Sequence, residues 1–232
     1  MDGSGAVRWT LNGVAIATTV NDQREVKIVA DGQGGAIMCW QSKAGSYTKI
    51  MAQAIDSTGQ VKWTENGISV CSTDNNQGFP TIVSDGLGGA IIAWEDNRNF
   101  SNDVYAQAID STGTLRWGMT GVSICTAIHS QCCIQIISDG ANGAILSWLD
   151  SRSTGAGIYT QAVSNMGIVK WAQDGIALST NGYGDSLTMT SDGAGGAIIA
   201  WNDSRNSNYD IYAQSVTGVG FVPVELSEFG IE

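Results

Sequence analysis

Two pairs of aspartates have a spacing that could support acid–base catalysis. Asp96 and Asp103 are seven residues apart, and so are Asp203 and Asp210. Two carboxyl groups at one centre can act as an acid and a base, as the hydrolysis of a glycosidic bond requires. An arginine follows the first aspartate of each pair by two residues. The alternative is therefore a hairpin closed by an Asp–Arg–Asp ion pair, because one guanidinium group can satisfy two carboxylates.

A short segment contains four side chains that could bind a metal ion. Cys125, His129, Cys132 and Cys133 form the pattern Cys-x3-His-x2-Cys-Cys. Thiolates and imidazoles are the usual zinc ligands, but this spacing is that of no standard zinc site. A disulfide from Cys125 to Cys132 or Cys133, or free thiols, are the other interpretations. We expect no cofactor, and these four residues stay weak candidates for a metal site.

The sequence Asp-Gly-x-Gly-Gly begins at Asp31, Asp85 and Asp192. Glycine-rich segments of this kind can hold phosphate, but only where a helix follows, and no helical pattern follows these. Calcium needs several oxygen ligands that converge, and each segment offers one aspartate. We expect three hairpin turns.

Composition limits the partners. Only 14% of the residues are charged, and the formal net charge is −11. A surface of this sign repels phosphate, which disfavours nucleic acid and anionic membranes as partners. No apolar run approaches 18 residues, so no membrane insertion is expected. The Ser, Thr, Asn and Gly content favours an extracellular or cell-surface protein, with the secretion leader absent from this sequence.

The tryptophans reveal an internal repeat of about 54 residues. All eight fall on two positions of the repeat. They are Trp9, Trp63, Trp117 and Trp171, spaced 54, 54 and 54 apart, and Trp40, Trp94, Trp148 and Trp201, spaced 54, 54 and 53 apart. In the second unit, short β-rich runs are predicted at 79–84, 90–95, 104–109 and 114–117, with turns between them. We call the four strands of a unit a, b, c and d.

Four-stranded antiparallel units that repeat along a chain are typical of a β-propeller. A β-solenoid is the rival, but its coil is about half as long as this period. We expect an all-β fold over residues 1–220, a small β-propeller of four four-stranded blades, with a tail or linker at 221–232. Residues 2–18 resemble the end of a unit, and the last unit lacks an Arg-Trp strand. Residues 6–9 should therefore pair with 210–215 and close the last blade, in a monomer or a strand-exchanged dimer. The alternative is that the four units are a piece of a longer repeat array.

The repeat also bears on the aspartate pairs. The third unit keeps Asp150 and Arg152 but has Gly157 in place of the second aspartate, and the first unit has none of the three residues. A set that varies in this way between copies indicates an ion pair that closes a hairpin, and we expect no catalytic residue here.

Two segments resemble motifs of known propellers. Residues 54–63, AIDSTGQVKW, resemble the tryptophan-docking motif of quinoprotein dehydrogenases, which implies that each tryptophan of the Trp63 set wedges between blades. Residues 203–212, DSRNSNYDIY, resemble the Asp-x-Arg…Asp-Ile-Tyr hairpin of the Tol-system propeller. The whole unit resembles repeats of secreted bacterial proteins. Residues 221–229, FVPVELSEF, resemble a junction that follows repeat domains in exported proteins of the Bacteroidetes.

In a propeller, the b–c loops and the connectors between blades share one face, and ligands commonly bind there. The side chains that we expect on that face as ligand contacts are Tyr47, Arg98, Phe100, Arg152, Tyr183, Arg205 and Tyr209. We expect a non-enzymatic extracellular binding or scaffold module whose partner is a carbohydrate or a protein surface. The alternative is a propeller-type glycoside hydrolase or lyase, which needs two carboxyl groups at one centre.

Overall fold

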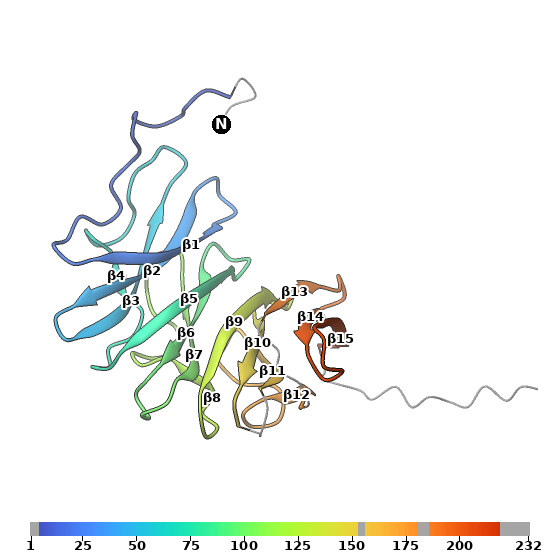
Figure 1. The fold of residues 1–232 in the computed structure, drawn as a ribbon. Helices are drawn as coiled ribbons and strands as arrows, with labels where there is room; N and C mark the ends of the chain where they lie inside the picture. Colours follow the sequence, from blue (N-terminus) through green and yellow to red (C-terminus); the bar gives the residue numbers. More distant parts are fainter. Residues whose placement is uncertain (1–4, 153–155, 181–185, 219–232) are drawn as a thin grey trace, which may run out of the picture.

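A computed structural model of the chain describes residues 5–152, 156–180 and 186–218 (Figure 1). These residues form strands, turns and irregular segments, and none of them forms a helix that could cross a membrane. The predicted tail at 221–232 lies outside the described residues. The strands are β1 (Gln23–Ala30), β2 (Ala36–Ala44), β3 (Tyr47–Ile55), β4 (Ile68–Ser69), β5 (Gln77–Ser84), β6 (Ala90–Asp96), β7 (Asp103–Ile109), β8 (Val122–Cys125), β9 (Gln131–Ser138), β10 (Ala144–Asp150), β11 (Gly157–Val163), β12 (Ile176–Ser179), β13 (Leu187–Ser191), β14 (Ala197–Asp203) and β15 (Asp210–Val216).

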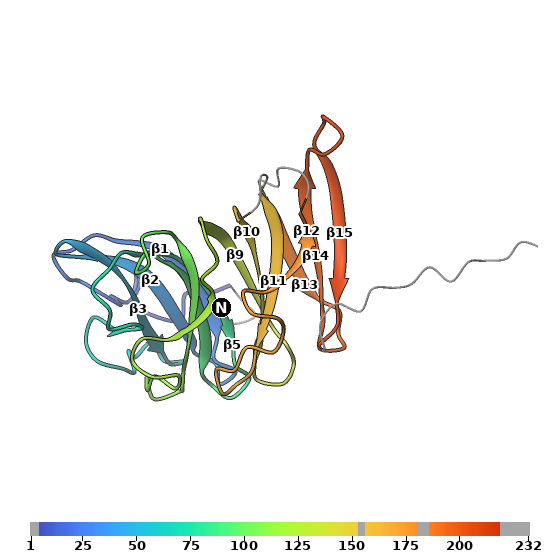
Figure 2. The same ribbon diagram turned by 90° about the horizontal axis from the view of Figure 1, so that it is seen from below.

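The strands form four antiparallel sheets, one for each sequence repeat. Their orders are β1-β2-β3-β4, β5-β6-β7-β8, β9-β10-β11-β12 and β13-β14-β15. The first strands of neighbouring sheets contact each other, and the four sheets lie side by side as a fan (Figures 1 and 2). This arrangement confirms the all-β fold of four propeller blades. We number the blades one to four along the chain.

The Asp-Gly-x-Gly-Gly segments are hairpin turns, as expected. In the second blade, Oδ1 of Asp85 accepts hydrogen bonds from the backbone N–H groups of Leu87 and Gly89, both at 2.8 Å. The same pair of bonds forms at Asp31, Asp139 and Asp192. The aspartate side chain therefore closes the turn by itself, which explains its place in every repeat.

The apolar core lies between the blades. Ile91 and Val104 of the second blade pack with Leu146 and Trp148 of the third, and all four side chains are fully buried. Burying an aliphatic side chain of this size contributes about 1.5–3 kcal/mol. Each blade is therefore stabilised mainly by its neighbours, because a single four-stranded sheet cannot cover its own faces.

The outermost strand of a blade is not the one expected. The sequence predicted it at 114–117, the Arg-Trp segment, but there only an isolated bridge joins Leu115 to Ile109. The outer strand is β8, eight residues further on, which pairs with β7. The Arg-Trp segment instead contacts the next blade, because its tryptophan points towards that blade.

Two of these tryptophans dock on a turn of the following blade. The indole N–H of Trp63 donates to the carbonyl oxygen of Ser111 at 3.2 Å, and that of Trp117 to the carbonyl oxygen of Asn165 at 3.0 Å. A Cβ atom on Gly113 would lie 2.9 Å from the Trp63 ring, so a side chain at that turn position would displace the indole. These contacts link the first blade to the second and the second blade to the third.

The N-terminal segment lies on the first blade. The indole N–H of Trp9 donates to the carbonyl oxygen of Ser57 at 3.3 Å, and the backbone N–H of Thr18 donates to Oδ1 of Asn66 at 2.8 Å. Among the described residues the fourth sheet has three strands, and β14 is the partner of β15. The predicted pairing of 6–9 with β15 is therefore absent from the part of the chain that the structure describes.

Candidate functional site

A cavity of about 500 Å³ lies where the first strands of three blades meet. This volume is in the range that binds small molecules or a few sugar rings. The lining residues are Glu25, Lys27, Phe79, Pro80, Thr81, Glu95, Cys132, Cys133, Ile134 and Gln135.

Three bulges shape the cavity wall. The ladders of β1 and β5 shift register around Glu25 and Phe79, and that of β9 shifts next to Cys133. These three residues have φ values of 55°, 49° and 60°. Non-glycine residues rarely adopt positive φ, and bulges that hold them concentrate next to functional sites. One repeat position thus presents a carboxylate, an aromatic ring and a thiol to the same cavity.

Glu95 is the buried carboxyl group of this site. It lies on β6 and is 6% exposed. Its Oε1 accepts a hydrogen bond from the backbone N–H of Cys133 at 3.2 Å, and its Oε2 accepts one from Nδ2 of Asn102 at 2.9 Å. Burial raises the pKa of Glu95 above its ordinary value, and these two hydrogen bonds oppose the rise only in part. A raised pKa favours the protonated form of the carboxyl group, which is the form that can donate a proton.

Glu95 and Phe79 also line a second cavity of about 270 Å³, beside the b–c loop of the second blade. A third cavity of about 230 Å³ shares Gln41 and Thr48 with the second. The three cavities are therefore linked by shared lining residues along blades three, two and one, and we call them together the groove; Glu95 lines its first two parts. The remaining residues of the second cavity are Asn76, Gln77, Gly78, Asn97 and Asn102.

The sequence reasoning missed Glu25 and Glu95, the two glutamates that line this groove. Each blade has a residue directly after its b-strand tryptophan, and only the second blade has a glutamate there. The others are Gln41, Leu149 and Asn202. The bulge position differs in the same way, since Glu25 corresponds to Phe79 and Cys133. A search for the repeat positions at which the blades disagree would have found both residues.

The predicted arginines lie in ion pairs within their own hairpins. Nη2 of Arg98 is 2.6 Å from Oδ2 of Asp96, and its guanidinium group stacks 3.7 Å from the centre of the Tyr105 ring. The second aspartate takes another partner, because Asp103 accepts a hydrogen bond from Asn99 at 2.6 Å. In place of the expected Asp–Arg–Asp ion pair, the hairpin therefore has an Asp–Arg ion pair whose guanidinium group stacks on a tyrosine ring. The third and fourth blades repeat it with Asp150, Arg152 and Tyr159, and with Asp203, Arg205 and Tyr212.

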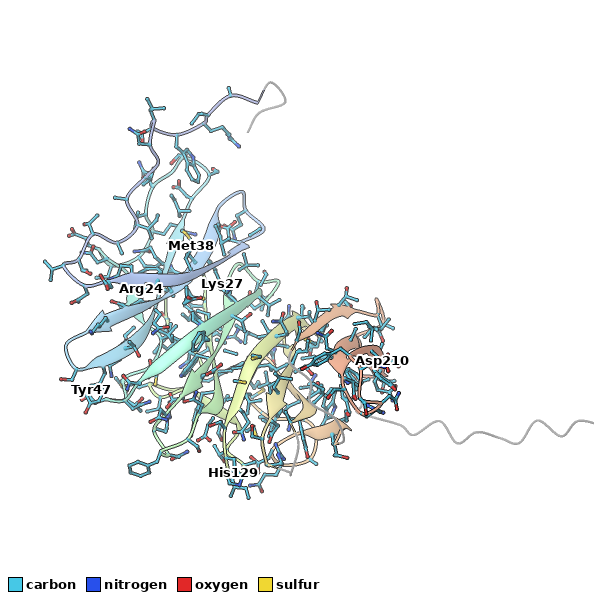
Figure 3. All side chains as sticks on the ribbon, viewed as in Figure 1. Arg24, Lys27, Met38, Tyr47, His129 and Asp210 are labelled. Carbon is cyan, nitrogen blue, oxygen red and sulfur yellow. The ribbon has the colours of Figure 1, made fainter. Side chains whose placement is uncertain are left out.

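The predicted aromatic contacts are not gathered into one site. Tyr47 is 41% exposed, Phe100 97% and Tyr209 62%, each near the tip of its own hairpin. Tyr183 lies outside the described residues. Tyr47, His129 and Asp210, which neighbours Tyr209, lie at separate places on the molecule (Figure 3). A role for these residues as ligand contacts stays a prediction.

The weak metal candidates do not form a site among the described residues, which hold no group of three or more His, Cys, Asp or Glu side chains placed around one point. Cys125 is buried and accepts a hydrogen bond from Arg152 at 3.0 Å, whereas His129 is exposed. All five cysteines are free thiols. The Sγ atoms of Cys132 and Cys133 are 3.3 Å apart. The contact with the Cys132 thiol lowers the pKa of Cys133 to about 7.

No family model matches the chain. Protein HIRA of Dictyostelium discoideum is 27% identical over 114 residues, which are 47% of this chain and 10% of that protein. The chain therefore spans about a tenth of the curated relative that it matches. Among solved structures, an endo-arabinase from Bacteroides thetaiotaomicron matches 90% of this chain over 76% of its own, with 13% identity and a TM-score of 0.46. A glycosyl hydrolase from Bacteroides ovatus matches 86% over 68%, with 10% identity and a TM-score of 0.46. The catalytic domain of the GH62 α-L-arabinofuranosidase from Coprinopsis cinerea matches 88% over 69%, with 7% identity and a TM-score of 0.47.

These comparisons contradict the expectation of a non-enzymatic binding or scaffold module. The solved structures named above are glycoside hydrolases, which is the class that the sequence left as the alternative. At such low identities and TM-scores the likeness concerns the path of the chain, and it assigns no substrate and no residue role. The function of this chain therefore depends on the residues of its own groove.

Proposed function

We propose that the chain is a glycoside hydrolase in which Glu95 is the general acid and Glu25 is the second carboxyl group. The proposal rests on Glu95, a buried carboxyl group with a raised pKa that lines two adjoining cavities of the groove. A glycosidic bond that lies across this point would have one sugar on each side of the acid.

The chemistry requires two carboxyl groups in different states. One must be protonated, so that it can give its proton to the leaving-group oxygen, and the other must be ionised, so that it can activate water or attack the anomeric carbon. Glu95 is buried and Glu25 is exposed on β1, and both line the same cavity. The difference in burial separates the two roles, because burial favours the neutral form of a carboxyl group.

The lining of the groove suits a carbohydrate chain. Amide and hydroxyl groups surround the second cavity, among them Gln41, Thr48 and Asn76, and such groups exchange hydrogen bonds with sugar hydroxyls. Phe79 is 60% exposed and offers an apolar ring face beside Glu95. The length of the groove favours an oligosaccharide or polysaccharide over a single sugar.

We infer that the protein acts outside the cell. The resemblance of its units to repeats of secreted bacterial proteins supports this, and so does its acidic, lysine-poor composition. The finer resemblance to tryptophan-docking propellers is supported by the contacts of Trp63 and Trp117 with the following blades. The resemblance concerns only the packing role of these tryptophans, and it implies no quinone chemistry for this chain.

The test is release of reducing sugar from a panel of plant and bacterial polysaccharides by the wild-type protein. The panel should include arabinan, xylan and β-mannan. We expect hydrolysis of at least one polymer by the wild-type protein and loss of at least about 100-fold in kcat for Glu95→Gln, the usual scale for a general acid. Glu65→Gln is the matched control, since Glu65 is exposed and lies outside the groove. Equal rates for Glu95→Gln and the wild type would refute the assignment.

A further inference from the structure

The fourth blade exposes an apolar face that is buried in every other blade. Ile198 and Ile211 are 45% and 75% exposed. Their equivalents in the second blade, Ile91 and Val104, are 0% exposed because the third blade covers them. In the repeat, the partner of this face is always the following blade. We call the face of β14 and β15 that contains Ile198 and Ile211 the trailing face.

The first blade exposes the complementary face. Val26 on β1 is 65% exposed, whereas its equivalents Ile134 and Leu187 are 6% and 8% exposed beneath the preceding blade. Next to Val26 lies a largely apolar cavity of about 490 Å³, whose other walls include Met38 and Trp40. We call this surface the leading face. Figure 3 shows Met38 on the first blade, far from Asp210 on the fourth.

The N-terminal segment occupies part of the leading face as the outer strand of a missing blade would. Val14, Ile16 and Ala17 pack against Met38 and Trp40. Their equivalents Ile68, Val70 and Cys71 belong to the first blade and pack in the same way on Ile92 and Trp94 of the second. Residues 14–17 therefore occupy the position of an outer strand on the first blade. The c strand that would pair with them does not come from the first blade.

The repeat defines which strand would fit beside this segment. In the first blade, Ala52 of β3 lies opposite Ile68, and Met51 lies opposite Ser69. The second blade keeps this register, with Ala106 opposite Val122. At the same repeat positions, Ala213 of β15 would lie opposite Val14, and Tyr212 opposite Ala15. Within the described part of the chain, β15 pairs with β14 on one side and with no strand on the other.

We propose that two copies of this chain assemble head to tail, the trailing face of one copy on the leading face of the other. β15 of one copy pairs with residues 14–17 of its neighbour and completes a four-stranded blade between them. A second copy is favoured over closure within one chain because the two faces lie at opposite ends of the fan (Figures 1 and 2). Such a contact is heterologous, so two copies form a ring if the rotation closes, and a longer chain if it does not.

Light scattering after size exclusion tests the assembly, and a disulfide tests its register. The wild-type protein should have at least twice the monomer mass of 24.3 kDa. Ile211→Asp should reduce it to the monomer mass, because a charge would be buried in the contact. Leu87→Asp is the matched control, since Leu87 is also apolar, 60% exposed and lies in the turn between β5 and β6, outside the residues that define the two faces, and it should keep the wild-type mass.

The double variant Val14→Cys with Ala213→Cys should form a disulfide-linked dimer or ladder on a non-reducing gel, which the wild-type thiols should not form. Far-UV circular dichroism of each variant establishes that it is folded. A wild-type monomer, an unchanged mass for a folded Ile211→Asp variant, or a disulfide that closes within one chain would each overturn the proposal. None of these readouts depends on hydrolysis, so this inference and the proposed function can fail separately.

Discussion

The backbone N–H of Cys133 donates to Oε1 of Glu95 at 3.2 Å, so a bulge of the third blade contacts a carboxyl group of the second. The bond joins two residues at repeat positions where the blades differ. It holds the carboxyl group at the junction of two cavities, where burial raises its pKa. The site therefore exists only where two particular blades meet.

The activity should fall as the pH rises through the pKa of Glu95, because the acid must be protonated to act. Asn102 donates a hydrogen bond to Oε2, and this bond favours the ionised form. Asn102→Ala should therefore raise the pKa further and move the alkaline limb of the kcat/KM profile to higher pH. A limb that moves to lower pH, or does not move, would contradict the role of Glu95.

Trp117→Ala should lower the free energy of unfolding by about 3–5 kcal/mol, the usual cost of emptying a buried aromatic site. Trp117 is 8% exposed and holds the second blade to the third through Asn165. Trp9→Ala is the matched control, since Trp9 occupies the same repeat position but is 40% exposed. Urea denaturation followed by circular dichroism measures both variants. Equal losses for the two variants would show that burial between blades is not the source of the stability.

Arg98→Ala should destabilise the protein by about 3–5 kcal/mol, because it leaves a buried carboxylate without its cation. Asp96 is 0% exposed and pairs with Arg98 at 2.6 Å. The pair of Arg24 with Asp22 is exposed on both sides, so Arg24→Ala should cost less than about 1 kcal/mol. Urea denaturation of the two variants compares them directly. A loss for Arg98→Ala as small as that for Arg24→Ala would contradict the structural role of the hairpin ion pair.

Cys133 should react with iodoacetamide at a half-maximal rate near pH 7, because its contact with the Cys132 thiol favours its thiolate. Cys132→Ala removes that contact, so the pKa of Cys133 should rise and its alkylation at pH 7 should slow by more than about tenfold. Mass spectrometry of the labelled peptides measures the rate. Cys39, whose pKa burial raises to about 12, should stay unlabelled in the folded protein. An unchanged rate in the Cys132→Ala variant would show that Cys132 does not control the thiol.

The blades could be predicted from the sequence because packing between them demands the same residues four times. Trp94 and Trp148, for example, are fully buried at one repeat position, and the turn at Asp85 recurs in every unit. The outer strand was misplaced because the Arg-Trp segment has a strand-like sequence, whereas its tryptophan binds the next blade. The pairing of residues 6–9 with 210–215 was predicted from the phase of the repeat. That phase does not define the angle between neighbouring blades, which decides whether the first and last blades meet.

The site could not be found by the same reasoning. Residues that recur hold the fold, so a search for recurring aspartates and arginines led to Arg98 and its ion pair with Asp96. Glu95 differs from its equivalents in the other three blades, and its importance depends on the neighbour that buries it. Bulges add to the difficulty, since no local pattern predicts that Glu25 adopts positive φ and lines the cavity.

The proposed role of Glu95 is to protonate the leaving group, and the dependence of kcat/KM on the leaving group tests this role. An activated aryl glycoside such as a dinitrophenyl glycoside needs no acid, because its leaving group departs as a stable anion, whereas an ordinary oligosaccharide needs one. We expect Glu95→Gln to lose at least about 100-fold in kcat/KM on the oligosaccharide and less than about tenfold in kcat/KM on the dinitrophenyl glycoside of the same sugar, because kcat/KM reports the step in which the leaving group departs. Equal losses on the two substrates, or no loss on either, would contradict it.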